Sequence, residues 1–164
     1  MIVGLGNELA RDDGVGIVVA RRLESLLRGR PDVEVLQLPW AGFALLDALV
    51  GRSRGVIIDC LTTGRHPPGR VLRLNESDFR GSVRLHSFHD INYPTALALG
   101  RAMGWTIPED IRIWGVEGDV VDEFGVGLTP PVRAAANQVV HEVLRHLDAV
   151  ACERPQARLA GAER

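Results

Sequence analysis

The stretch GVIIDC, residues 55–60, constrains the fold more than any other part of the chain. It is a continuous apolar run that closes with an acid and a cysteine. Such a run is typical of a strand in a parallel sheet, because helices bury both faces of that sheet. Parallel strands are joined by crossovers, which are usually helical. We therefore expect helices before and after this strand, in an α/β fold.

The apolar pattern elsewhere predicts an alternation of strands and helices. Short apolar runs predict strands, and apolar residues at three- and four-residue spacing predict helices. The predicted strands are residues 2–5, 33–38, 55–60, 69–74 and a run from 110, and the predicted helices begin near residues 14, 43, 93 and 129. This alternation predicts a three-layer sandwich, a mostly parallel twisted sheet flanked by helices, of the phosphorylase/hydrolase-like kind.

Size and charge limit the domain count and the partners. We expect one domain over residues 1–150 of the 164 and a flexible tail over 151–164, where Ala, Arg, Glu and Pro prevail. The 19 basic and 21 acidic residues are scattered, and the net charge of −2 does not favour a nucleic-acid partner. Met1 leads straight into a strand, and no run approaches the ~20 apolar residues of a membrane span. We expect a cytoplasmic protein without membrane insertion, with Cys60 and Cys152 as free thiols.

The loop after the first strand, GLGNELARDDGVG at residues 4–16, resembles a phosphate-binding loop in its glycines only. The dinucleotide fingerprint needs a third glycine where this chain has Leu9. Asp12 and Asp13 would also place two negative charges where a pyrophosphate binds. A Walker-type loop needs a lysine, which this loop lacks. The loop is therefore suited to some other ligand.

Acids follow two of the predicted strands, and the carboxyl ends of parallel strands meet at one edge of a sheet. Asp12 is a residue type that caps the helix behind it, so Asp13 needs another role. Asp59 closes the central strand, where a carboxylate is costly unless it is paired, hydrogen-bonded or bound to a cation. Asp13 could also be only an acid in the first turn of the helix, and Asp59 only a cap or a loop anchor.

A histidine in LHSFHDINYP, residues 85–94, is the third candidate for a site. His86 and His89 are three residues apart, and either could be an ordinary surface residue. The remaining histidines, His66, His141 and His146, are interpreted as surface positions. Two carboxylates and one imidazole would suit a borderline divalent ion such as zinc or nickel.

Six segments in order resemble one known family. GLGNELARDDGVG looks like the signature of the hydrogenase maturation endopeptidases, which carry G-x-G-N, an apolar residue, and then Asp-Glu or Asp-Asp before Gly-x-Gly. WAGFALLDAL resembles the family's turn into its second helix, GVIIDC its central strand, and PPGRVLRL its following hairpin. SFHDINYPTALALGRAMG is similar to its histidine segment, and WGVEGDVVDEFGVGLTPPVRAAANQVV to its closing strand, loop and helix. The resemblance extends to about Val150.

The resemblance implies a site. It assigns the metal-contacting and catalytic roles to Asp13, Asp59 and His89. His89 is preferred to His86 because the family's histidine lies two residues after the position of Ser87. The residues expected to bind substrate are Gly6, Asn7 and Gly42.

The resemblance also implies a function. The family removes a short C-terminal extension from the precursor of a [NiFe]-hydrogenase large subunit, after nickel has been loaded into that precursor. The nickel would therefore arrive with the substrate. The isolated protein, expected to be a monomer, could hold another divalent ion such as zinc or cadmium.

The chain departs from the family pattern in two places, and the chemistry stays open. Asp13 stands where many members have Glu, and residues 38–42, LPWAG, replace an acid-Gly-Gly-Thr stretch. The attacking water could be activated on the metal or by an aspartate acting as general base, as in an aspartyl protease. Cys60 is a poor nucleophile candidate, because adjacent strand residues point to opposite faces and Asp59 precedes it.

Two alternative functions share these motifs. MIVGLGN is also how peptidyl-tRNA hydrolases begin, but their Pro-Gly and Thr-Arg-His-Asn are replaced here by Glu8-Leu9 and Arg11-Asp12-Asp13-Gly14. A non-catalytic nickel-sensing or docking protein for the hydrogenase precursor would carry every motif. Only an activity measurement separates that protein from a protease.

Overall fold

The computed structural model describes residues 1–39, 41–79 and 93–153. Its elements in chain order are β1 (Ile2–Leu5), the 3-10 helix η1 (Arg11–Gly14), α1 (Val15–Leu26), β2 (Val35–Leu38), α2 (Gly42–Leu49), β3 (Arg54–Leu61), β4 (Val71–Asn75), α3 (Glu76–Phe79), α4 (Tyr93–Ala102), β5 (Asp110–Glu117) and α5 (Pro130–Glu153). The predicted strands and the four predicted helices are all present. The short helices η1 and α3 have no counterpart in the sequence-based prediction.

The strands form one sheet in the order β2-β1-β3-β5-β4. β1 pairs in parallel with β2 and with β3, and β3 pairs in parallel with β5. β4 lies at the edge and pairs antiparallel to β5, since the chain returns from β3 to β4 through residues 62–70 without a crossover helix. The mostly parallel sheet expected from the apolar runs is confirmed.

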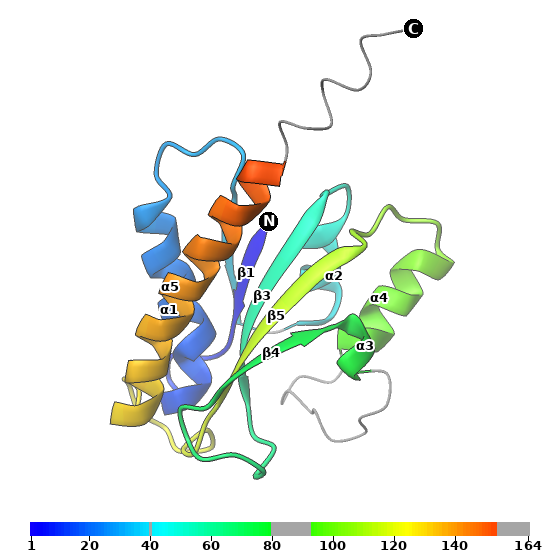
Figure 1. The fold of residues 1–164 in the computed structure, drawn as a ribbon. Coiled ribbons are helices and arrows are strands. Elements are labelled where there is room, and N and C mark those ends of the chain that lie inside the picture. Colours follow the sequence, from blue (N-terminus) through cyan, green and yellow to red (C-terminus); the bar gives the residue numbers. More distant parts are fainter. Residues whose placement is uncertain (40, 80–92, 154–164) are drawn as a thin grey trace, which may run out of the picture.

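Helices cover both faces of this sheet, as Figure 1 shows. α1 and α5 pack on one face, where Val19, Leu23 and Val139 have no exposed surface. α2 and α4 pack on the other face, where Leu45 and Leu97 are equally buried. The predicted three-layer sandwich is therefore confirmed.

Glycines allow α1 to lie very close to the sheet. A Cβ on Gly16 would lie 2.2 Å from the carbonyl oxygen of Leu5 and 2.4 Å from that of Ile58. A Cβ on Gly4 would lie 2.2 Å from the carbonyl oxygen of Gly16. No other residue fits these contacts without moving the backbone. The close packing of α1 on β1 and β3 sets the position of the loop that joins β1 to α1.

The C-terminal helix is longer than the sequence predicted. α5 begins with two prolines, which the first turn of a helix tolerates, and it continues through Glu153, beyond the expected boundary at residue 150. The rest of the predicted tail, residues 154–164, lies outside the described residues. Cys60 and Cys152 are free thiols, as predicted. In the described part of the chain, no helix has the length and apolarity needed to cross a bilayer.

Candidate active site

We use the term carboxyl edge for the edge of the sheet at which the parallel strands β1, β2, β3 and β5 end. The loop of residues 6–14 follows β1 at this edge. Gly4 of β1 is paired with Ile58 of β3, so this loop begins beside Asp59. η1, which carries Asp13, contacts β3. The fold thus brings together the two acids that the strand pattern had placed at one edge.

Asp13 is half-buried and is held by its own loop. Its Oδ2 accepts a hydrogen bond from the backbone N–H of Asn7 at 2.8 Å. Gly6 has a φ of +138°, and a Cβ there would lie 1.9 Å from the carbonyl oxygen of Asp13. Only glycine fits this close approach and this backbone conformation. Gly6 and Asn7 therefore position Asp13, which is a sufficient structural reason for both residue types.

Asp59 is a half-buried residue of β3 whose carboxyl group is desolvated. Burial, the largest cause, and the negative charge of Asp13 together raise the pKa of Asp59 to about 7, although a hydrogen bond from the Cys60 N–H at 2.9 Å partly opposes both effects. Each effect acts on the charged form of the acid. Near neutral pH the acid pair therefore favours binding a proton or a cation. Perturbed carboxyl groups of this kind are typical of functional sites.

Cys60, the neighbour of Asp59, is not a nucleophile in this site. Its side chain is buried, and burial raises the pKa of its thiol far above the usual range, with further increases from the charges of Asp59 and Asp13. The thiolate is the reactive form of cysteine, and it is suppressed here. The sequence-based argument against Cys60 reached the same conclusion.

The histidines do not complete a three-residue metal site within the described residues. His86 and His89 both lie outside them, and elsewhere no group of three or more His, Cys, Asp or Glu side chains could hold a metal ion. His66 and His141 are exposed, as predicted. The surface prediction for His146 is wrong, because its half-buried ring packs 5.4 Å from the ring of Trp114.

Asp12 does not cap α1, which corrects the sequence-based expectation. The residue before α1 is Gly14, and no side chain caps the helix there. Asp12 is fully buried and accepts hydrogen bonds from the N–H groups of Asp119 at 3.2 Å and Val120 at 3.4 Å. It also accepts bonds from the Thr129 N–H at 2.7 Å and the Thr129 hydroxyl at 3.0 Å. Asp12 therefore fastens the loop after β1 to the loop after β5 and to the start of α5.

Glu117, at the end of β5, is a second buried acid that sequence reasoning missed. It accepts hydrogen bonds from the Thr63 hydroxyl at 2.8 Å and from the Gly64 N–H at 2.7 Å. These contacts hold the segment that follows β3. The only sequence signal was an acid that ends an apolar strand, which is the signal that identified Asp59.

Gly42, the third residue expected to bind substrate, begins α2 shortly after β2 ends at the carboxyl edge. Its φ is +64°, and a Cβ there would meet no atom within 4 Å. The neighbouring Phe43 is 56% exposed. Contacts of Gly6, Asn7 and Gly42 with a substrate stay predictions.

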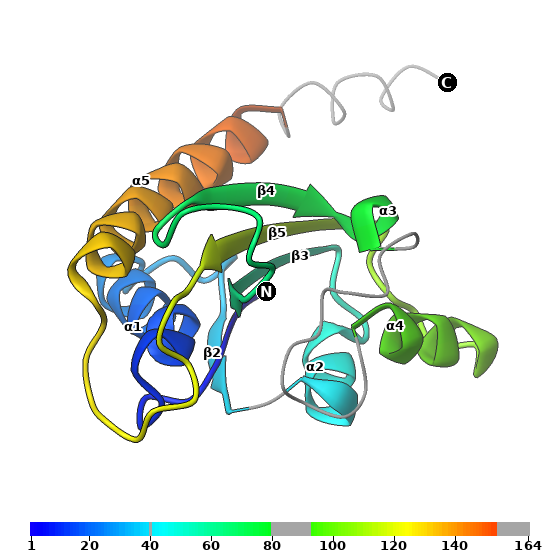
Figure 2. The ribbon, with the colours of Figure 1, turned by 90° about the horizontal axis from the view of Figure 1, so that it is seen from below.

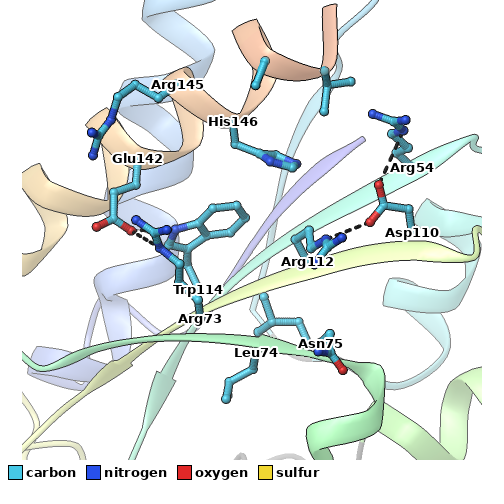
Figure 3. Close-up of a pocket in the computed structure, with 13 residues that line it drawn as sticks. Arg54, Arg73, Leu74, Asn75, Asp110, Arg112, Trp114, Glu142, Arg145 and His146 are labelled. Atoms are coloured by element: carbon cyan, nitrogen blue, oxygen red, sulfur yellow. Dashed lines mark hydrogen bonds and ion pairs between the residues drawn. The ribbon is translucent and has the colours of Figure 1, made fainter. Parts of the chain in front are cut away.

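A cavity of about 550 Å³ lies away from the acid pair, between α5 and the strands β4 and β5 (Figure 3). It reaches Arg54 and Asp110, the first residues of β3 and β5, and therefore the end of the sheet opposite the carboxyl edge. Asp110 contacts Arg112 at 2.8 Å and Arg54 at 3.5 Å. Three of its arginines, Arg54, Arg73 and Arg112, already pair with acids, and neither Asp13 nor Asp59 lines it.

Comparisons with known proteins identify a family. A family model described as hydrogenase maturation protease matches residues 17–146. Hydrogenase 2 maturation protease from Escherichia coli (strain K12) is 26% identical over 151 residues, which cover 90% of this chain and 89% of that protein. Hydrogenase expression/formation protein HupD from Thiocapsa roseopersicina is 25% identical over 150 residues, which cover 90% of this chain and 66% of that protein.

Solved structures agree in fold. An endopeptidase from Escherichia coli, solved in solution, has a TM-score of 0.74 and 26% identity, with 91% of this chain and 93% of that chain covered. A [NiFe] hydrogenase maturation protease HybD from Thermococcus kodakarensis has a TM-score of 0.65 and 26% identity, with 89% and 96% covered. The architecture is thus that of a class of α/β endopeptidases. The family model matches most of the length of this chain. Together with the shared fold, this match shows that the chain belongs to the hydrogenase maturation protease family.

Proposed function

We propose that this protease removes the C-terminal extension from a nickel-loaded precursor of a [NiFe]-hydrogenase large subunit, and that it recognises the nickel in that substrate. The observation that carries the proposal is the pair of acids at the carboxyl edge, Asp13 and Asp59, in which burial and mutual repulsion raise the pKa of Asp59. A cation delivered by the substrate would offset both the burial of the two carboxylates and the repulsion between them. The same ion carried away with the product would leave the site ready for another precursor.

The donor set suits a substrate-borne ion. Asp13 uses one carboxylate oxygen, Oδ2, to accept the Asn7 N–H, and Asp59 uses one, Oδ1, to accept the Cys60 N–H. These bonds hold the two carboxyl groups in place. Two carboxylates with an imidazole from His89 would form an incomplete shell for a borderline divalent ion. The isolated protein would bind zinc or cadmium through the same groups.

Two routes of peptide hydrolysis are compatible with this pair. In the first, Asp59 accepts a proton from a water whose oxygen attacks the scissile carbonyl carbon, and then returns the proton to the amine that leaves as the C–N bond breaks. A pKa near 7 suits a general base at neutral pH. In the second, both carboxylates bind nickel, which lowers the pKa of the attacking water.

We further propose that the protease acts as a monomer in the cytoplasm, where the large-subunit precursor is its partner. The nearly balanced charge of −2 is in keeping with a protein partner rather than a nucleic acid. The segment 38–42, which lacks the acid found in many relatives, is expected to give this chain a recognition preference of its own.

The test uses the purified full chain with nickel-loaded and nickel-free precursor, and follows precursor mass. Truncation of the nickel-loaded form alone is expected. Equal truncation of both forms would overturn the proposal that the protease recognises the nickel. Binding without truncation would instead indicate a non-catalytic docking protein.

Variants assign the roles. Asp59→Asn and His89→Ala are expected to abolish truncation, while Asp47→Asn, which changes an exposed acid on α2, is expected to leave it unchanged. If Asp59 is only a general base, Asp59→Asn keeps its affinity for the nickel-loaded precursor, and if Asp59 is a ligand, that affinity falls as well. Asp13→Glu, which introduces the acid of many relatives, should retain truncation, whereas Asp13→Asn should not.

A further inference from the structure

Two apolar side chains beside the candidate active site are strongly exposed. Phe124 is 87% exposed and Val126 is 74% exposed, the highest values among the large apolar residues that the structure describes. Leu9, on the neighbouring loop, is 49% exposed. We call these three residues the apolar tip. An exposed group of large apolar side chains often marks a site of protein–protein interaction.

The apolar tip is built from two loops that are paired through their backbones. Ala10 and Gly125 form an isolated parallel bridge. The Gly125 N–H donates to the Leu9 carbonyl oxygen at 2.8 Å, and the Arg11 N–H donates to the Gly125 carbonyl oxygen at 3.0 Å. Phe124 and Val126 flank Gly125 directly, so the pairing places them beside Leu9.

A buried carboxylate fixes the same two loops a second time. Asp12 accepts hydrogen bonds from Asp119, Val120 and Thr129, and its own N–H donates to the Val120 carbonyl oxygen at 2.9 Å. Arg11, between the two tethers, has a φ of +53°, the only positive value among the described non-glycine residues. A buried carboxylate and a strained backbone both cost free energy. The fold therefore holds the apolar tip in one position at a cost in free energy.

The tethers also connect the apolar tip to the acid pair. Asp12 and Asp13 are neighbours in η1, so the residue that anchors the second loop is adjacent to the candidate metal-contacting residue. In Figure 2 the loop that leads from β5 to α5 and the loop that leads from β1 to α1 lie side by side beyond the strand ends. A large substrate that reaches Asp13 would pass over the apolar tip.

Charges around the apolar tip define the partner further. Asp119, Asp122 and Glu123 are exposed on the same loop. The basic residue beside them is Arg11, whose guanidinium lies 3.9 Å from Glu123. The rim is therefore acidic, and it complements a partner surface on which basic residues surround an apolar patch.

We propose that the apolar tip is the docking surface for the folded body of the hydrogenase large-subunit precursor, separate from the contacts made to its nickel and its scissile bond. This inference rests on the proposed function for the identity of the partner. Phe124 inserts into an apolar depression of the precursor, and the acidic rim meets basic side chains around it. Aromatic side chains of this kind dominate the energetics of protein interfaces.

The test compares the full chain with its Phe124→Ser and Val126→Ser variants in truncation of the nickel-loaded precursor. Leu26→Ser is the matched control, since Leu26 is 61% exposed at the end of α1 that points away from the carboxyl edge. Exposed positions contribute little to folding, and thermal unfolding checks this for each variant. We expect Phe124→Ser to raise KM at least tenfold with kcat within twofold of the original, and Leu26→Ser to change neither.

The outcomes separate the two proposals. Truncation with an unchanged KM in both Phe124→Ser and Val126→Ser would overturn the docking surface and leave the proposed function intact. If the original chain does not truncate the precursor, the proposed function fails. A measurement of precursor binding then tests the docking surface independently of truncation. Binding that is weakened at least tenfold by Phe124→Ser supports it, and equal binding or none overturns it.

Discussion

Asp13 and Asp59 lie close enough that the negative charge of Asp13 adds to the effect of burial in raising the pKa of Asp59 to about 7. One acid comes from the loop after β1 and the other from the end of β3, and the parallel pairing of these strands brings them together. The repulsion is unfavourable in the folded chain without a cation. A site of this kind sacrifices stability for a function that needs both charges.

Replacing Asp59 should therefore stabilise the protein in the absence of metal. The raised pKa of Asp59 means that its protonated form supports folding fully below about 3.8, and that this support is lost as the pH rises through about 7. Asp59→Asn keeps the neutral form at every pH. We expect the variant to have a higher free energy of unfolding than the original chain. This gain in stability should be about 1–3 kcal/mol larger at pH 8 than at pH 5.

Urea unfolding of metal-free protein at the two pH values measures this difference. Asp47→Asn, on the exposed side of α2, is the control and should show no such pH dependence. An Asp59→Asn variant that is less stable than the original chain at pH 8 would contradict the desolvated acid pair.

Asp12 should be the acid whose loss is most damaging to stability. Asp12→Ala leaves the N–H groups of Asp119, Val120 and Thr129 without their acceptor. We expect a loss of about 3–5 kcal/mol, as for other buried charged networks that lose one partner. Chemical denaturation gives the value, and Asp119→Ala, which removes an exposed side chain from the same loop, should cost less than about 0.5 kcal/mol.

Gly6 should tolerate no side chain. Gly6→Ala places a Cβ 1.9 Å from the Asp13 carbonyl oxygen at a φ of +138°. Since backbone atoms must move, we expect a loss of more than about 2 kcal/mol together with reduced truncation. Gly51→Ala is matched in having a positive φ, +72°, but a Cβ there meets no atom within 4 Å. It should cost about 1 kcal/mol and leave activity unchanged. Equal costs would show that backbone conformation, and not the contact with Asp13, sets the requirement.

Glu142 should support folding through its charge. Its carboxylate accepts hydrogen bonds from the Arg73 guanidinium at 3.0 Å and from the Trp114 ring N–H at 2.9 Å (Figure 3). The bond from Arg73 is the main cause that lowers the pKa of Glu142 to about 2. A lowered pKa gives stability that is present above about 4.5 and is lost as the pH falls towards 2.

Glu142→Gln is therefore expected to be less stable than the original chain at pH 7, with the difference shrinking between pH 4.5 and pH 2. Unfolding curves at several pH values measure this, with Glu109→Gln at an exposed position as the control. A difference that stays constant with pH would show that packing rather than charge is responsible.

The sequence was sufficient to predict the architecture and the proximity of the two acids, Asp13 and Asp59. GVIIDC predicted the central strand because a parallel strand buried on both faces needs apolar residues at successive positions. The rule that parallel strands end at one edge then predicted that Asp13 and Asp59 would meet. Both inferences work because the burial of side chains follows the period of a strand or helix. The pattern of apolar and polar residues that are close in sequence therefore indicates which side chains are buried. His89, carried by the family resemblance, lies outside the described residues and stays a prediction.

Other features depend on contacts between distant parts of the chain. Asp12 looks like a helix cap in sequence, since Thr129, its partner, is far away and becomes adjacent only when α1 and α5 pack on the same face. His146 looks like a surface residue until α5 places it against Trp114 of β5. Local periodicity determined which residues are buried, whereas hydrogen-bond partners and the exposed apolar tip were decided by packing, because directional contacts need both partners in place.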